Sequence, residues 1–127
     1  MSEQVEKWLL KAEHDLIVAR NESKIEGAPT DVICFHCQQA VEKYLKAFLT
    51  HHQVDMRRTH NIAELLTLCI EKDRDFEELK KRRIYELTIY AVQVRYPDDF
   101  YIPSPEETTE ALTMAEYTRA FVMRKLS

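Results

Sequence analysis

Four polar side chains interrupt an otherwise apolar stretch near the middle of this chain, and their types suit the binding of a charged ligand. They are Gln39, Glu42, Lys43 and Lys46, which lie three or four residues apart and therefore share one face of a helix. The lysines can add positive charge to a phosphate site. Surface decoration is the ordinary interpretation of such residues. The apolar residues around them make this helix central, however, so its polar atoms need partners.

A second group of residues with binding chemistry forms the stretch Arg95-Tyr96-Pro97-Asp98-Asp99. The guanidinium of Arg95 is a planar fork of donors suited to phosphate, and the ring of Tyr96 offers a base a stacking surface. Asp98 and Asp99 would repel a bare phosphate unless a Mg²⁺ ion bridges them to it. Together with the first group, this stretch predicts a nucleotide site that uses Mg²⁺ with its ligand and requires no other cofactor.

Histidine and cysteine also occur where metal sites or catalytic groups are often found. Cys34 and Cys37 have the Cys-x-x-Cys spacing, but they lie within a helix and no second pair completes a tetrahedral site. Buried free thiols are therefore expected, and no metal site. His51 and His52 complement the dipole at a helix end. His60 precedes a helix start, where it either orients a neighbouring carboxylate or contacts a ligand, and the sequence leaves both interpretations open.

Apolar residues recur every three or four positions in five segments, which predicts five helices. Their expected positions are about 3–22, 30–51, from Asn61 onward, from Asp75 to Pro97, and from Ser104 onward. Residues that suit the first position of a helix precede each one. These expected capping residues are Ser2, Thr30, Asn61 with Glu64, Asp75 with Glu78, and Ser104 with Glu107. In the fourth helix, Arg83 falls near the stripe that faces inward.

The composition agrees with a helical protein of one domain. The 127 residues include a single glycine and four prolines, so little material exists for tight β-turns or flexible linkers. We therefore expect an all-α fold, an up-and-down antiparallel bundle of four or five helices that spans residues 1–127. The net charge of −4 excludes attraction of the whole molecule to nucleic acid. Three cysteines, no secretory pattern and no apolar run of about 20 residues predict a cytoplasmic protein without a membrane span.

Four pieces of the sequence, in this order, resemble the HEPN family (higher eukaryotes and prokaryotes nucleotide-binding domain). They are the stretch 8–16 beginning with Trp8, the helix that contains Gln39, Thr59-His60-Asn61, and Arg95-Tyr96-Pro97. The resemblance implies an antiparallel helical bundle that forms a homodimer, a prokaryotic source, and nucleotide binding. It also implies a separately encoded minimal nucleotidyltransferase as partner, in a toxin–antitoxin-like pair. Many relatives are metal-independent endoribonucleases, whose motif is an arginine followed after four to six residues by a histidine.

The chain departs from that ribonuclease motif. Arg95 matches the arginine, but Phe100, Tyr101 and Ile102 occupy the positions where the histidine belongs. Tyrosine is a poor replacement because its usual pKa of about 10 keeps it protonated at neutral pH. We therefore expect a dimeric binding module for a nucleotide or a nucleotidyltransferase rather than an enzyme. Two alternatives are an endoribonuclease acting on RNA with His60 and Arg95, and a helical scaffold without a ligand.

Two apolar features predict the homodimer independently of the resemblance. The second helix carries more apolar surface than one seam of a bundle needs, and the stretch from Tyr96 to Ile102 is rich in aromatic residues. Apolar patches that would otherwise face water usually mark interfaces.

Overall fold

The described part of the chain is helical and contains no β-strand. The structure is a computed structural model of the chain, and it describes residues 1–56, 58–91 and 101–127. The α-helices are α1 (Glu3–Ser23), α2 (Thr30–His51), α3 (Ile62–Lys72), α4 (Glu77–Lys81) and α5 (Pro105–Leu126). Two 3₁₀ helices complete the set, η1 (Arg74–Phe76) and η2 (Ile84–Tyr90). The expected all-α bundle is confirmed.

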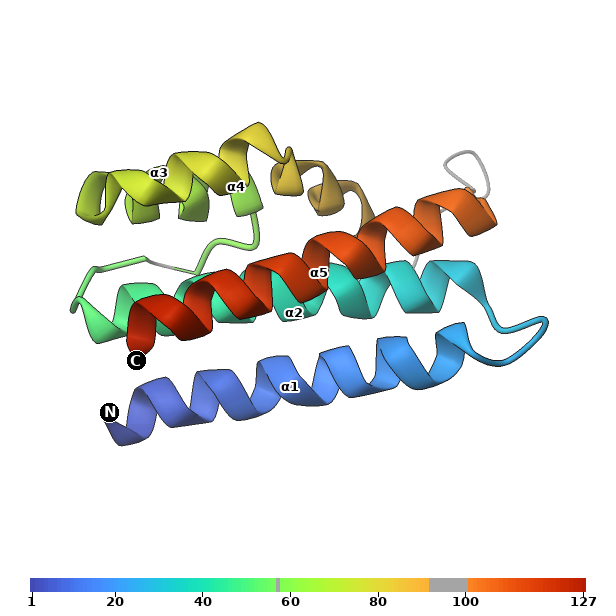
Figure 1. The fold of residues 1–127 in the computed structure, drawn as a ribbon, viewed down its shortest axis with the longest axis horizontal. Helices are drawn as coiled ribbons and strands as arrows, with labels where there is room; N and C mark the ends of the chain where they lie inside the picture. The colour runs from blue at the N-terminus through green and yellow to red at the C-terminus, as the bar shows by residue number, and fades with distance from the viewer. Residues whose placement is uncertain (57, 92–100) are drawn as a thin grey trace.

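Helix α2 lies at the centre of this bundle. It packs against α1, α5, α3 and η2, whereas α1 contacts chiefly α2 and, to a smaller extent, α5. Figure 1 shows α1 along one side of the bundle, the α3–α4 layer along the other, and α5 crossing in front of α2. The two chain termini lie at the same end of the bundle. As a result, α2 is covered by three neighbouring layers and α1 has a free outer face.

The burial of α2 explains its apolar composition. Thirteen of its 22 residues are buried, including the large side chains of Tyr44, Leu45, Phe48 and Leu49. The apolar surplus that predicted a dimer interface on this helix is therefore used inside one protomer. Exposed large apolar side chains are found elsewhere: Leu10, Ile17 and Val18 on α1, Ile89 on η2, and Tyr101 and Ile102 before α5.

Three of the five predicted helix caps are confirmed, and two are wrong. The side chains of Ser2 and Asn61 accept hydrogen bonds from backbone amides of the first turn, and Ser104 forms a complete capping box with Glu107. Thr30 does not cap α2. The cap position is occupied by Pro29, whose backbone is extended where the chain enters α2. Within the described part of the chain, the hydroxyl of Thr30 has no hydrogen-bond partner.

Asp73, rather than Asp75, caps the next element. Its carboxylate accepts from the backbone N–H of Asp75 at 2.9 Å and opens η1. The prediction failed because both aspartates are plausible caps and only the chain path distinguishes them.

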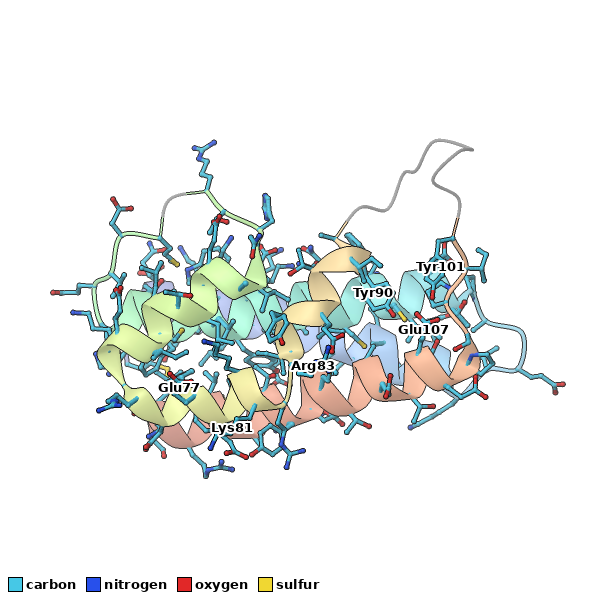
Figure 2. All side chains as sticks on the ribbon, turned by 90° about the horizontal axis from the view of Figure 1, so that it is seen from above. Glu77, Lys81, Arg83, Tyr90, Tyr101 and Glu107 are labelled. Carbon is cyan, nitrogen blue, oxygen red and sulfur yellow. The ribbon has the colours of Figure 1, made fainter. Side chains whose placement is uncertain are left out.

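The fourth predicted helix is interrupted at Arg83. This residue has a left-handed backbone (φ 60°). Figure 2 shows Arg83 at the connection between α4 and η2. In a continuous helix, Leu79 and Ile84 would point about 140° apart. The interruption allows both side chains to be fully buried while Arg83 turns outward and pairs with Glu86. The prediction that Arg83 lies near the inward stripe is therefore wrong.

Within the described ranges, the helices are too short or too polar to cross a lipid bilayer.

Candidate functional site

The carboxylate of Glu42 is the centre of a buried polar cluster on α2. Its Oε1 accepts a hydrogen bond from the amide of Gln38 at 3.1 Å. Its Oε2 accepts from Nζ of Lys46 at 2.9 Å and lies 3.0 Å from Nδ1 of His60. Both Gln38 and Lys46 lie four residues from Glu42, so local helix geometry places them together. The segment that enters α3 brings His60 to the same carboxylate.

This carboxylate stays ionised although it is buried. Burial by itself would raise the pKa of Glu42, but the hydrogen bonds from His60, Lys46 and Gln38 outweigh that effect and hold the pKa below its usual value. Because an ionised carboxylate only accepts hydrogen bonds, Nδ1 of His60 must carry a proton and donate it. The cluster therefore fixes the orientation of the imidazole.

His60 is the part of this cluster that a ligand can reach. Its side chain is 71% exposed, whereas the side chain of Glu42 is 3% exposed. With Nδ1 occupied, Nε2 is the ring nitrogen left for a ligand or for proton transfer. Of the two interpretations that the sequence left open, the contact of His60 with a carboxylate is confirmed, and its contact with a ligand stays a prediction.

Lys46 adds a buried positive charge behind His60. Its side chain is 7% exposed, and its Nζ lies 5.3 Å from the ring centroid of Trp8 on α1, which gives a cation–π contact. Together, Glu42 and Lys46 carry no net charge. The charge that this cluster presents to a ligand therefore depends on His60.

A second cluster with the same construction lies along α2. The carboxylate of Asp15, on α1, is 2.9 Å from Nδ1 of His36 and accepts from Nζ of Lys43 at 2.5 Å. Asp15 is buried, whereas His36 and Lys43 are partly exposed, with side-chain exposures of 23% and 21%. Again a buried carboxylate holds one lysine and one imidazole.

Gln39 is linked to the Glu42 cluster by hydrogen bonds and lies on the same side of α2 as His36 and Lys43. Its amide nitrogen donates to Oε1 of Gln38 at 2.6 Å, and Gln38 in turn donates to Glu42. Gln39 is half-buried, as are Phe35, His36 and Lys43 on the same side of the helix. We use the term α2 polar face for Phe35, His36, Gln39, Lys43 and His60. The structure thus brings together five of the nine predicted site residues: Gln39, Glu42, Lys43, Lys46 and His60.

The other four predicted residues, Arg95, Tyr96, Asp98 and Asp99, lie outside the described residues. The sequence analysis missed Asp15, His36, Gln38 and Trp8. A signal for two of them was present, because Trp8 and Asp15 are seven residues apart and share one face of α1.

A third polar cluster joins Tyr90 and Tyr101, the residues that flank the stretch carrying Arg95. The phenol of Tyr90, at the end of η2, donates to one oxygen of Glu107 at 2.7 Å, and the phenol of Tyr101 donates to the other. Figure 2 shows these three side chains together near the start of α5. Hydrogen bonds from both phenols hold the pKa of Glu107 below its usual value. One carboxylate therefore joins both flanks of residues 92–100.

The cysteines do not form a reactive or metal-binding group. Cys34, Cys37 and Cys69 are all buried and free, and burial raises the pKa of each thiol. Among the described residues, no three His, Cys, Asp or Glu side chains lie close enough to hold a metal ion. The expected buried free thiols are confirmed.

The fold and the polar clusters define a helical-bundle protein whose central helix α2 carries a buried polar core. The HEPN domain matches residues 5–126, and the chain therefore belongs to the HEPN domain family. No curated protein sequence shows a significant match.

Two solved structures are similar over the whole chain. The crystal structure of TT1696 from Thermus thermophilus shares 28% identity with a TM-score of 0.79, covering 98% of this chain and 99% of that one. The crystal structure of ST0689, an archaeal HEPN homologue, shares 27% identity with a TM-score of 0.71 and full coverage of both chains.

Proposed function

We propose that this protein is a binding module that holds the phosphate of a nucleotide at the exposed imidazole of His60. The observation that supports this most is the Glu42–His60 hydrogen bond. The buried carboxylate fixes the ring, and when the ring is protonated its Nε2–H can donate to a phosphate oxygen. Lys46 balances the charge of Glu42 behind the ring. Arg95, from the stretch joined at both ends to Glu107, is the expected second phosphate contact.

The proposal includes assembly with other chains. The outer face of α1 exposes Leu10, Ile17 and Val18, which share one side of the helix and suit contact with a second copy. The family resemblance adds a separately encoded minimal nucleotidyltransferase as the heterologous partner. Light scattering at micromolar concentration tests the homodimer, and a mass of 15.1 kDa at all concentrations would exclude it.

Calorimetric titration tests the ligand. ATP and GTP are titrated into wild-type protein, His60→Ala and Arg95→Ala, with and without Mg²⁺. We expect weak binding that Mg²⁺ changes and that both substitutions reduce. Lys80→Gln, which removes an exposed lysine on α4, is the matched control. Equal heats for wild type and His60→Ala would remove His60 from the site.

The Glu42–His60 pair also favours a second candidate function, an endoribonuclease. A histidine oriented by a carboxylate can take a proton from a ribose 2′-hydroxyl, and an arginine can stabilise charge on phosphate. Incubation of single-stranded RNA with the protein and a chelator tests this candidate. Cleavage that is lost in both His60→Ala and Arg95→Ala would favour the enzyme, whereas intact RNA would favour the binding module.

A further inference from the structure

The Asp15–His36–Lys43 cluster repeats the construction of the Glu42–His60–Lys46 cluster further along α2. In each, one buried carboxylate contacts a lysine Nζ and a histidine Nδ1. Lys43 already pairs with Asp15, so the imidazole of His36 is not needed to neutralise that carboxylate. The ring is partly exposed, and among the described residues its Nε2 has no hydrogen-bond partner, as at His60.

We infer that His36 and Lys43, held by Asp15, form a second phosphate subsite on the α2 polar face. This inference rests on the proposed function and specifies the ligand further. His36 is six residues before Glu42, so these two positions are about 9 Å apart along the helix axis and about 120° apart around it. With one subsite at each position, the ligand that fits carries at least two phosphate groups.

The surroundings of the second subsite favour a ligand that also contains a base. Phe35 is half-buried on the same face, and its ring meets that of His36 edge to face, with centroids 5.4 Å apart. Aromatic rings beside cations are the usual contacts for the bases of single strands. Gln39, between the two clusters, keeps its carbonyl oxygen and one N–H for further hydrogen bonds after donating to Gln38.

The charge along the face is compatible with such a ligand. Asp15 and Glu42 are each paired with a lysine, so they do not present free negative charge. Lys11 is exposed on α1 one turn before Asp15, and Arg58 is exposed two residues before His60. Both extend the positive potential at the edges of the face, although the net charge of the whole chain is −4.

Two kinds of molecule share this chemistry: a short single-stranded oligonucleotide and a dinucleoside polyphosphate. Fluorescence anisotropy and calorimetry with AMP, diadenosine tetraphosphate, and RNA strands of two, three and six nucleotides separate these sources. We expect AMP to bind more weakly than the ligands that reach both clusters.

The variants His36→Asn and Lys43→Gln test the second subsite. Each variant retains a group that can donate to Asp15. Each should weaken the binding of the longer ligands by about tenfold, which is the loss of affinity expected for one charge-assisted hydrogen bond. AMP binding should change less than twofold. Lys80→Gln again serves as the control. A second measurement needs no variant: the chemical shifts of the histidine ring protons in the wild type are followed as ligand is added. The chain has five histidines.

The outcomes distinguish this inference from the proposed function. Weaker binding of the longer ligands to the His36 and Lys43 variants, together with a change in the chemical shifts of the His36 ring protons, would support the second subsite. Unchanged binding in these variants, combined with loss in His60→Ala, would overturn the second subsite and leave the proposed function intact. Failure of every ligand to bind the wild type would overturn both.

Discussion

Nδ1 of His60 lies 3.0 Å from a carboxylate oxygen of Glu42, although the two residues are 18 positions apart and only one of them is buried. The pair connects the interior of α2 with the surface of the bundle. A buried ionised group is expensive unless it is paired, so the cluster around Glu42 affects both stability and the candidate site.

Removing the charge of Glu42 should destabilise the fold. In Glu42→Gln the side-chain volume is kept, but the buried ammonium of Lys46 loses its counter-charge. Breaking a buried pair from one side typically costs about 3–5 kcal/mol. We expect a loss in stability near the lower end of that range, about 3 kcal/mol, because the cluster reaches solvent through the exposed side chain of His60. Urea denaturation measures it. Glu71→Gln, on the exposed side of α3, should change stability by less than about 0.5 kcal/mol.

The same cluster predicts a dependence of stability on pH. The pKa of Glu42 in the folded protein is below its usual value of 4.5, so the unfolded chain takes up the proton first as the pH falls. The contribution of Glu42 is therefore fully present above the unfolded value and is lost as the pH falls below about 4.5 through the folded value. Denaturation midpoints between pH 7 and pH 3 measure this loss. The decline should be shallower in Glu42→Gln, and an identical decline would contradict the assignment.

Glu13 connects three helices and gives an independent test of polar packing. Its Oε1 accepts from the phenol of Tyr44 on α2 at 2.6 Å and from Nε of Arg119 on α5. Tyr44→Phe removes one of these donors without creating a cavity, and Arg119 still neutralises the carboxylate. The free energy of unfolding should fall by about 1–2 kcal/mol. No change in a denaturant titration would indicate that the phenol contributes nothing to the network.

The two tyrosines on Glu107 should differ in their contribution to stability. Tyr90 is partly buried and Tyr101 is exposed, although both donate to the same carboxylate. Tyr90→Phe should therefore cost about 1 kcal/mol and Tyr101→Phe distinctly less. Absorbance titration offers a second check, because burial and the Glu107 hydrogen bond raise the pKa of Tyr90 above its usual value of 10. Ionisation of all tyrosines near pH 10 would contradict this contact.

The three thiols should be unreactive in the folded protein. Burial raises their pKa values, and only a thiolate is a good nucleophile. An aromatic disulfide reagent at pH 8 should label fewer than about one thiol per chain in the native state, and three after denaturation. Rapid labelling of the native protein would show that at least one of Cys34, Cys37 and Cys69 is accessible.

The features that depend on local geometry could be predicted from the amino-acid sequence. The positions of α1, α2 and α5, and the caps at Ser2, Asn61 and Ser104, follow from spacing and capping rules that act within one turn. The Glu42–Lys46 pair was predictable for the same reason, because residues four apart on a helix must meet. The central place of α2 also followed from sequence, since a helix that is apolar on two sides has to be covered on both.

Which side chains from different elements meet could not be predicted from the sequence and follows from the packing of the whole bundle. The contacts of His60 with Glu42 and of Asp15 with His36 and Lys43 depend on the rotation of α1 against α2 and on the path of the chain into α3. The interruption at Arg83 likewise depends on the core, because burying both Leu79 and Ile84 outweighs the loss of helical hydrogen bonds. Such choices are energy differences between whole packings, and no spacing along one helix encodes them.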